Sequence, residues 1–395
     1  MRIAVIEPVP FGGLLHYAVQ LADALAERGN DVDLIVAREN ELSARSGPAR
    51  RRELLPAGAT AHSGDPTRLE ATLRRARTAL RLTKTWGQIA RQVRFGSYDA
   101  VLINGSLDLS LTALGAWTVN LVKGKTAVSH VCHNPRPFNR WGGSDLFVDS
   151  GLSVKMLRRA YPSFDLLFVH GEKSLEDYNA TWPPTEMALI PHGDEGIFAE
   201  EPPPPAEEPR ILFFGAWRKM KGLPVLMEAF DLLADRRPDV RLTIAGPPVP
   251  EEGEAEKVLA WAAERSERVE VRPDYVPLED VEGLFARSRV VVMPYLAGYQ
   301  SGVVHLAMTM ERAVVASDVG DLPAAVADGE TGRVVASGDV PALVDALDAV
   351  VGDAELARRF GAEGRARVMN GSGWPTVAED VETALRAAVE RRARR

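Results

Sequence analysis

EGIFAEEPPPPAEEP, residues 195–209, divides the chain into two stretches of similar length. Its four consecutive prolines can neither continue a helix nor donate to a β-ladder, so the segment is predicted to be a linker. On each side of it, short apolar runs alternate with helical patterns. This alternation indicates βαβ units with parallel sheets, and the linker therefore predicts two successive α/β lobes.

The predicted strands give the two lobes the same rhythm. They cover 3–7, 32–36, 99–103, 126–131, 165–169 and 187–191 before the linker, and 210–214, 240–245, 269–272, 289–293, 313–317 and 333–335 after it. The predicted domains are 1–195, a linker over 196–209, 210–375, and a terminal helix over 376–395 placed where it can pack across the hinge. Ligands of such sheets bind at the carboxyl ends of the strands, so we expect a site in the cleft between the lobes.

Composition restricts the class of protein. The 395 residues carry a net charge of −8 and a single cysteine, Cys132, which excludes an internal disulfide. The N-terminus begins directly with a strand and shows no secretory signal, so a cytoplasmic location is expected. The most apolar long stretch, 107–122, is too short to span a bilayer and is predicted to be a core helix.

Basic residues are concentrated in the first lobe. Residues 45–94 hold 12 basic and 3 acidic side chains, whereas residues 200–395 carry a net charge of −10. One reading is a solvated, arginine-rich helix face. The other is a surface that meets an anionic partner: the inner face of a membrane, a lipid-linked acceptor, or an acidic or phosphorylated acceptor. No nucleic-acid partner is expected.

Three glycine-containing turns follow predicted strands and suit phosphate binding. Gly12 and Gly13 precede a helix, where backbone N–H groups favour an anion. After the strand at 210–214, Gly215 is followed by Arg218 and Lys221, one planar fork and one point charge for a diphosphate.

The third turn lies in PYLAGYQSGVVHLAM, 294–308. Ser301 and Gly302 are predicted to begin a helix, and their amides would face a phosphate without a charged side chain. No G-x-G-x-x-G follows the first strand and no G-x-x-x-x-G-K-[ST] occurs, which disfavours dinucleotide dehydrogenases and P-loop NTPases. Together the three turns predict a nucleotide-diphosphate site.

Four segments resemble those of one enzyme family. They are FFGAWRKMKGLPVLMEAF (213–230), the stretch from Val290 to the D-G-E-T-G close at Gly332, GGLLHY (12–17) and VCHNPRPF (131–138). The chain resembles the retaining glycosyltransferases of the GT-B fold that are related to sucrose synthase, in the branch with a Q-S-G-V loop. The resemblance implies two Rossmann-like lobes, a nucleotide-sugar donor bound chiefly by the second lobe, an acceptor bound by the first, and neither metal nor further cofactor.

The resemblance also implies roles for particular residues. Arg218, Lys221 and His133 are expected to be catalytic, and the donor is expected to contact Gly12, Gly13, Gly215, Gln300, Ser301, Gly302 and Val303. The family commonly carries two glutamates eight residues apart in the donor segment. This chain has Gly298 and Leu306 there, so Gln300 and backbone groups are expected to replace part of their function.

Other polar residues remain candidates for contacts with the sugar or the acceptor. They are Asn134, Glu172 and His192. His133 follows the predicted strand 126–131, so its side chain either faces the cleft or forms hydrogen bonds with nearby backbone groups. The string HVCH (130–133) is not predicted to bind metal, because alternation along a strand separates His133 from His130 and Cys132.

The predicted function is a nucleotide-sugar-dependent retaining glycosyltransferase. Two other enzyme classes on the same fold stay open, an epimerase and a sugar phosphorylase, although an epimerase needs carboxylates that the predicted cleft lacks. A transferase-like binding subunit is the non-enzymatic alternative, kept open by the missing glutamates.

Overall fold

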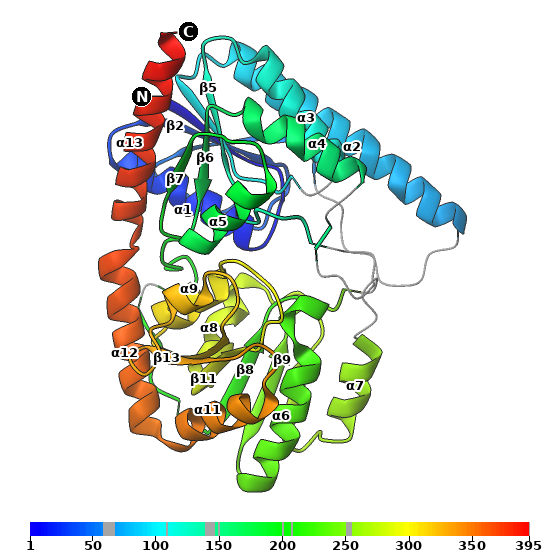
Figure 1. Cartoon of the computed structure of the whole chain (residues 1–395), viewed down its shortest axis with the longest axis vertical. Helices are drawn as coiled ribbons and strands as arrows, with labels where there is room; N and C mark the ends of the chain where they lie inside the picture. Colours follow the sequence, from blue (N-terminus) through cyan, green and yellow to red (C-terminus); the bar gives the residue numbers. More distant parts are fainter. Residues whose placement is uncertain are drawn as a thin grey trace.

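The computed structural model describes residues 1–57, 68–107, 110–138, 147–148, 151–199, 201–206, 208–249 and 255–394. It has two α/β lobes, one above the other in Figure 1. Each lobe is built on one parallel sheet, of seven strands in lobe one and six in lobe two. The predicted architecture of two doubly wound Rossmann-like lobes is therefore confirmed.

Lobe one has the strand order β3-β2-β1-β4-β5-β6-β7. Its strands are β1 (Arg2–Glu7), β2 (Asp31–Ala37), β3 (Arg50–Leu55), β4 (Ala100–Ile103), β5 (Ala127–Val131), β6 (Leu166–Val169) and β7 (Met187–Leu189). Its helices are α1 (Gly13–Glu27), α2 (Arg68–Phe95), α3 (Ser110–Val122), α4 (Leu152–Ala160) and α5 (Glu172–Thr181). The central strands β1, β4 and β5 are apolar almost throughout because both faces of the sheet are covered by helices.

Lobe two has the strand order β10-β9-β8-β11-β12-β13. Its strands are β8 (Arg210–Phe214), β9 (Arg241–Ala245), β10 (Val269–Arg272), β11 (Val290–Met293), β12 (Ala313–Ser317) and β13 (Gly332–Val335). Its helices are α6 (Leu223–Arg236), α7 (Ala255–Ala263), α8 (Leu278–Ala286), α9 (Gly302–Thr309), α10 (Leu322–Ala325), α11 (Val340–Gly352) and α12 (Ala354–Gly371).

The direction of winding reverses once in each lobe, between β1 and β4 in lobe one and between β8 and β11 in lobe two. Loops that leave neighbouring strands in opposite directions open a crevice at the carboxyl ends, where ligands of such sheets bind. The segments after β8 and β11 are two of the loops that the sequence predicted to hold a diphosphate.

Strand β3 was not predicted from the sequence. It is an edge strand rich in arginine, RRRELL, and it begins in the basic block. Arg50 and Arg52 both donate to the carboxylate of Asp33, whose side chain is fully buried. These arginines therefore neutralise a buried charge of the fold.

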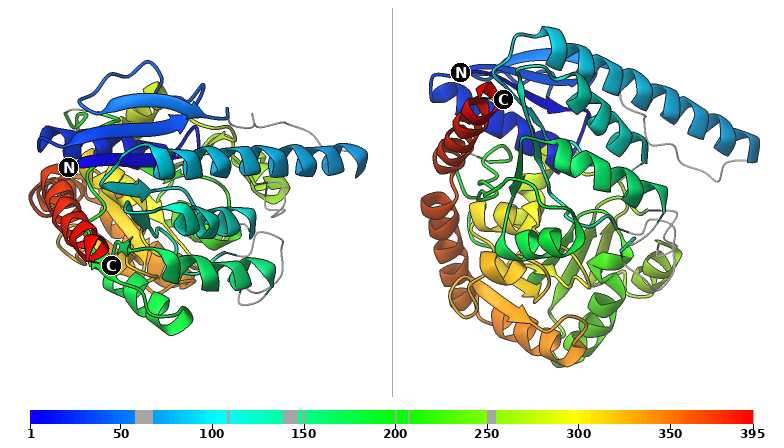
Figure 2. Two further views of the ribbon diagram at one scale, coloured as in Figure 1. Left: turned by 90° about the horizontal axis from the view of Figure 1, so that it is seen from above. Right: turned by 45° about the horizontal axis from the view of Figure 1, so that its top comes forward.

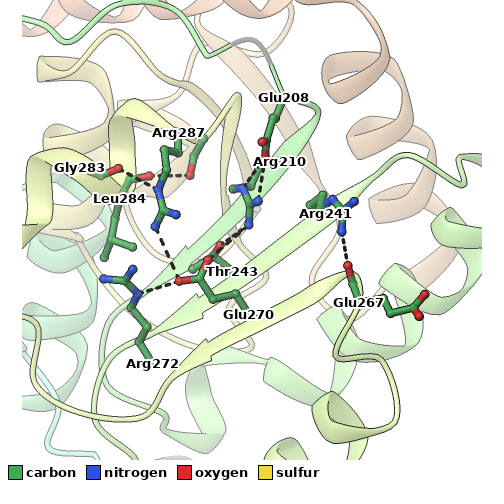
Figure 3. A network of polar contacts seen from close by, with 11 residues as sticks. Glu208, Arg210, Arg241, Thr243, Glu267, Glu270, Arg272, Gly283, Leu284 and Arg287 are labelled. Atoms are coloured by element: carbon green, nitrogen blue, oxygen red, sulfur yellow. Dashed lines mark hydrogen bonds and ion pairs between the residues drawn. The ribbon is translucent and has the colours of Figure 1, made fainter.

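Arginines are used in the same way in lobe two. Figure 3 shows Glu270 of β10 between Arg210 of β8, Arg272 of β10 and Arg287, with ion-pair distances of 3.5, 2.8 and 3.7 Å. Partial burial would raise the pKa of Glu270, but the hydrogen bond from Arg272 and the charges of the three arginines outweigh it and lower the pKa. This network ties together the strands on one side of the lobe-two sheet.

The end of the chain returns to lobe one. Helix α13 (Trp374–Ala393) packs against α1 and contributes Trp374, Val377, Val381 and Leu385 to the lobe-one core. In Figure 1, α12 (orange) lies along lobe two and α13 (red) continues along the same side past lobe one. The linker is held in place as well, since Arg312 donates to the carbonyls of Pro203 and Pro204 at 2.7 and 2.6 Å.

A carboxylate of lobe two caps a helix of lobe one. Helix α5 begins after Gly171 without a capping side chain of its own. Asp321, which precedes α10, accepts hydrogen bonds from the backbone N–H of Lys173 (2.9 Å) and Ser174 (3.3 Å) and from Ser174 Oγ (2.5 Å). A side chain at Gly171 would collide with Asp321. The lobes are therefore joined through a helix N-terminus as well as through the linker.

We expect Asp321→Ala to lower the free energy of unfolding by about 1 kcal/mol, the usual value of an N-cap. It should also speed amide hydrogen exchange in the segment 171–181 of lobe one, because the cap is supplied from the other lobe. Asp353→Ala is the matched control, since Asp353 caps α12 within lobe two at 3.0 Å from two amides. If α5 exchanged equally fast in both variants, the inter-lobe cap would be of no consequence.

Candidate active site

The loop after β8 carries the two cations predicted to meet a diphosphate. Arg218 is half-buried in extended backbone and precedes a 3₁₀ turn over Lys219–Lys221. The ammonium of Lys221 lies 3.6 Å from the centre of the Tyr295 ring, a cation–π contact. Met220 accepts a backbone hydrogen bond from Leu296 at 2.8 Å, so the loops after β8 and β11 are fastened together.

The loop after β11 leads to the first turn of α9. The hydroxyls of Tyr295 and Ser301 lie 3.3 Å apart. Ser301 is buried and extended, and its side chain does not cap the helix, so it leaves the first amides of α9, from Gly302 onward, without a side-chain partner from the cap. Lys221, Tyr295 and Ser301 thus form a continuous line from the cation to the amides of the helix start.

The glycine turn of lobe one faces open space. Gly12 has φ +82°, which favours glycine, and Gly13 begins α1. A side chain built on Gly12, on Gly13 or on Gly215 of lobe two would meet no other atom within 4 Å. These are the properties expected of backbone that a ligand approaches closely. By contrast, a side chain on Gly222 would strike the carbonyl of Pro294, so that glycine serves loop packing.

A carboxylate that the sequence did not reveal sits beside this turn. Glu41 Oε1 accepts the N–H of Gly12 (2.5 Å) and contacts His16 Nε2 (2.6 Å), and its Oε2 accepts the hydroxyl of Tyr275 in lobe two (2.5 Å). Burial would raise the pKa of Glu41, but these hydrogen bonds outweigh it and lower the pKa. The start of α1 therefore already holds one anionic group, and Tyr275 links that group to the other lobe.

Four histidines line up across the inter-lobe boundary. His133, His170 and His192 follow β5, β6 and β7, and His305 lies on α9; neighbouring ring centres are 4.9, 5.4 and 4.6 Å apart. Tyr17 of α1 packs edge-on against the first three. Burial lowers the pKa of His170 and His305 to about 4, and lowers that of His133 and His192 well below the usual value. All four rings are therefore neutral at physiological pH.

Both ring nitrogens of His133 have partners within lobe one. Nε2 lies 2.9 Å from Asn104 Oδ1, and Nδ1 lies 3.2 Å from His170 Nε2. An amide oxygen can only accept, so Nε2 of His133 carries the proton and Nδ1 is the acceptor. A sugar hydroxyl could bind His133 only through Nδ1, in place of His170, and the predicted catalytic role of His133 stays a prediction.

A cavity of about 390 Å³ opens where these histidines meet lobe two. Its polar lining includes His170, His192, His305, Gln300, Ser301, Asp321 and Arg367, and its apolar lining includes Met308, Leu322 and Val368. Gln300 Oε1 and His305 Nδ1 are buried without a hydrogen-bond partner among the described residues. The structure thus brings the predicted residues His192, Gln300 and Ser301 together around a polar space that Asp321 and Arg367 also border.

The remaining predicted residues lie around this centre. Asn134 lines a small cavity of about 20 Å³ with His133, and Glu172 is exposed at the first position of α5. Val303 is half-buried and packs on the lobe-two core. Leu306 is fully within that core, so nothing at its position accepts a hydrogen bond from a ligand.

Metal ligands do not gather within the described ranges of the chain, where no group of three or more histidine, cysteine or acidic side chains could hold an ion. His130 bonds the carbonyl of Ile103 and Cys132 lies within 3.7 Å of the Tyr161 hydroxyl, whereas His133 turns toward Asn104. The alternation inferred for HVCH is therefore the one observed.

Two family models match the chain, one for each lobe. Residues 208–353 match the family described as "Glycosyl transferases group 1", and residues 11–193 match "Glycosyltransferase Family 4". Both models include the loops described above.

Relatives of known activity agree with these matches. An alpha-maltose-1-phosphate synthase of Mycolicibacterium smegmatis is 33% identical over 59% of this chain, and the chain spans only 60% of that protein's length. A D-inositol 3-phosphate glycosyltransferase of Pseudarthrobacter chlorophenolicus is 27% identical over 96% of this chain and 91% of its own length.

Solved structures share the architecture. Sucrose-phosphate synthase of Thermosynechococcus elongatus superposes with a TM-score of 0.76 at 21% identity, covering 98% of both chains. HepE of Anabaena, solved in complex with UDP-glucose, gives a TM-score of 0.71 at 14% identity over 98% of this chain and 100% of that one. These likenesses establish the GT-B fold, and the two matches show that each lobe is similar to a glycosyltransferase family.

Proposed function

We propose that the protein is a retaining glycosyltransferase that moves a sugar from a nucleotide-diphosphate sugar to an acceptor. The observation that carries the proposal is the contact line Lys221–Tyr295–Ser301, which joins a cation to the start of α9 at the switch point of lobe two. The open glycine turn of lobe one lies at the corresponding switch point of the other sheet. Cations and helix-start amides together suit a diphosphate.

The proposed reaction depends on stabilising the nucleoside diphosphate as it leaves the sugar. The bond between the anomeric carbon and the diphosphate oxygen breaks, and its electron pair stays on the diphosphate. The acceptor oxygen attacks from the same face, and its proton passes to a phosphate oxygen. Arg218, Lys221 and the amides of Gly302 and Val303 stabilise the negative charge that develops, which is the term that contributes most in such sites.

The sugar would enter the cavity lined by His192, Gln300 and Ser301. The neutral histidines, Gln300 and Ser301 offer hydrogen bonds to sugar hydroxyl groups, and Asp321 and Arg367 also line the cavity. No cofactor beyond the donor is proposed. Proton abstraction, which an epimerase requires, is less favoured, since Asp321 caps α5, Glu41 holds Gly12, His16 and Tyr275, and Glu195 accepts a hydrogen bond from Gln20.

A thermal-shift panel tests donor binding directly. We expect at least one of UDP-glucose, UDP-N-acetylglucosamine, ADP-glucose and GDP-mannose to raise the melting temperature, since a ligand at 100 times its Kd adds about 2.7 kcal/mol. Free glucose and inorganic phosphate serve as controls and should have little effect. A panel in which no nucleotide or nucleotide sugar stabilises the protein would contradict the proposal.

The outward face of α2, α3 and α4 supports a second proposal, contact with an anionic membrane surface. The helices lie side by side over one face of the lobe-one sheet, and α2 projects beyond the lobe (Figure 2). The exposed stripe of α2 carries Arg77, Lys84, Arg91 and Arg94. On α3, Leu121 is 65% exposed, with Leu111, Leu114 and Val122 also exposed, and Lys155 and Arg159 of α4 lie beyond them.

An apolar stripe between two cationic helices matches the boundary between lipid head groups and acyl chains. Arg74 and Arg75, part of the same basic block, and residues 58–67 lie outside the described side chains. No helix in the described ranges combines the length and apolarity needed to cross a bilayer, so this would be attachment to one face.

Replacing Arg77, Lys84, Arg91 and Arg94 by Gln should abolish co-sedimentation with vesicles that contain phosphatidylserine. Each cation near such a surface contributes about 1 kcal/mol, and the attachment should weaken with salt. The matched control replaces four exposed cations of lobe two, Arg236, Lys257, Arg358 and Arg359. Equal, negligible binding of the wild-type protein to anionic and neutral vesicles would remove the membrane and leave a solvated helix face or a soluble anionic acceptor.

A further inference from the structure

Two buried polar side chains face each other at the switch point of lobe one. Glu7 ends β1 and Asn104 follows β4, the two strands between which the winding reverses. Both side chains are completely inaccessible to solvent. Burial of a carboxylate is costly unless hydrogen bonds compensate, and the hydrogen bonds of this pair are therefore important to the fold around it.

Asn104 joins three parts of the lobe-one site. Its Nδ2 donates to Glu7 Oε2 at 2.7 Å and to the carbonyl of Leu14 at 2.8 Å, and its Oδ1 accepts from His133 Nε2 at 2.9 Å. Leu14 is the second residue of α1, directly after the Gly12–Gly13 turn. The carbonyl of Leu14 can only accept, which fixes the orientation of the amide. Asn104 therefore sets both the position of the glycine turn and the tautomer of His133.

Glu7 holds Asn104 and the same loop. Its second oxygen, Oε1, accepts the N–H of Val9 at 2.7 Å, so the segment 7–14 is tied to one carboxylate at its beginning and to one amide at its end. Burial raises the pKa of Glu7 to about 7, against the two hydrogen bonds that lower it. An unpaired donor in this buried place would cost more than the bond itself contributes.

We propose that Asn104, supported by Glu7, is a positioning residue for donor cleavage: it holds the glycine turn of lobe one and the Nδ1 atom of His133 in one arrangement. The proposal rests on the proposed transferase function. It predicts that disturbing Asn104 slows the chemical step and leaves nucleotide binding, which lobe two chiefly provides, nearly intact. Misplacement of a reacting group by about 1 Å can cost about 10²-fold in rate.

The test compares Asn104→Asp with the exchanged pair Glu7→Gln/Asn104→Asp. Asn104→Asp keeps the shape of the side chain but places two carboxyl groups against each other. We expect kcat for hydrolysis of the nucleotide sugar that the wild-type protein cleaves to fall about 10²-fold. In the exchanged pair, the amide introduced at position 7 can donate to the carboxylate introduced at position 104 and still accept from Val9, whereas the carbonyl of Leu14 faces a carboxylate oxygen in both variants. We therefore expect the double variant to be faster than the single one.

Asn120→Asp is the matched control. Asn120 is a buried asparagine of α3 that donates to the carbonyl of Ala116 at 2.9 Å, away from the cleft. It should leave kcat unchanged. The Kd of the nucleoside diphosphate, measured by calorimetry, should change little in all variants, and melting temperatures report on folding separately.

Two results would overturn the inference: an Asn104→Asp variant with the kcat of the Asn120→Asp control, or a folded double variant no faster than Asn104→Asp. A loss confined to nucleoside-diphosphate affinity would also overturn it, since a positioning role acts on kcat. If the wild-type protein neither binds nor cleaves any nucleotide sugar, it is the proposed function that fails, and these comparisons then have no rate to measure.

Discussion

Gly302→Pro is expected to abolish binding of the nucleotide-sugar donor, whereas Gly302→Ala is expected to bind it with nearly wild-type affinity. Gly302 is the first residue of α9, where proline is well tolerated, and Ser301 before it has the extended backbone that a following proline requires. The proline variant therefore keeps the helix and loses one N–H at the phosphate position.

The alanine variant controls for the added side chain. A Cβ at this position lies 3.1 Å from Glu195 Oε1, a tight contact that alanine and proline share. The difference between the two variants then measures the loss of the amide N–H together with the space that the proline ring takes in its place. Calorimetric titration with the stabilising nucleotide sugar is the measurement. If both variants bound equally well, the start of α9 would not be the phosphate site.

Lys221→Ala and Arg218→Ala should each lower kcat about 10²-fold and weaken donor binding far less. The reason is that charge develops on the diphosphate in the transition state, so a cation placed there contributes more to the rate than to ground-state affinity. For Lys221 the geometry gives a further reason, because the ring of Tyr295 holds the ammonium beside the α9 start.

Lys219→Ala is the control for the second prediction. Lys219 belongs to the same 3₁₀ turn as Lys221, and the resemblance gives it no role in the site. Steady-state hydrolysis of the donor, followed as release of nucleoside diphosphate, separates kcat from KM. Rates in the Lys221 and Arg218 variants that match those of the Lys219 variant would remove the leaving-group role.

The fold was predictable because most of the strands are short apolar runs bounded by turn residues. The predicted strands 210–214, 269–272 and 313–317 coincide with β8, β10 and β12. Strand β3 escaped prediction because its residues are mostly charged, and an edge strand paired with a buried aspartate does not produce an apolar run. The sequence alone does not show which arginines face solvent and which form ion pairs, because the ion-pairing partners lie on a neighbouring strand.

The site was predictable to the extent that it follows strand ends. Gly12, Gly215 and the 300–302 segment could be located by that rule, and the same rule, applied to 99–103 and 165–169, would also have found Asn104 and His170. The link between Glu41 and Tyr275 gives no such signal, since the residues lie 234 positions apart and meet only when the lobes face each other. The capping of α5 by Asp321 is equally invisible in sequence, because its partners belong to the other lobe.

Time-resolved proton NMR of donor turnover distinguishes retention from inversion at the anomeric carbon. The protein is incubated with the α-linked nucleotide sugar that stabilises it most, and the anomeric signal of the first sugar released to water is recorded before mutarotation. For a retaining enzyme, we expect release of the nucleoside diphosphate together with the α-anomer. Initial formation of the β-anomer, or a stabilising donor that is never cleaved with any acceptor or with water, would contradict it.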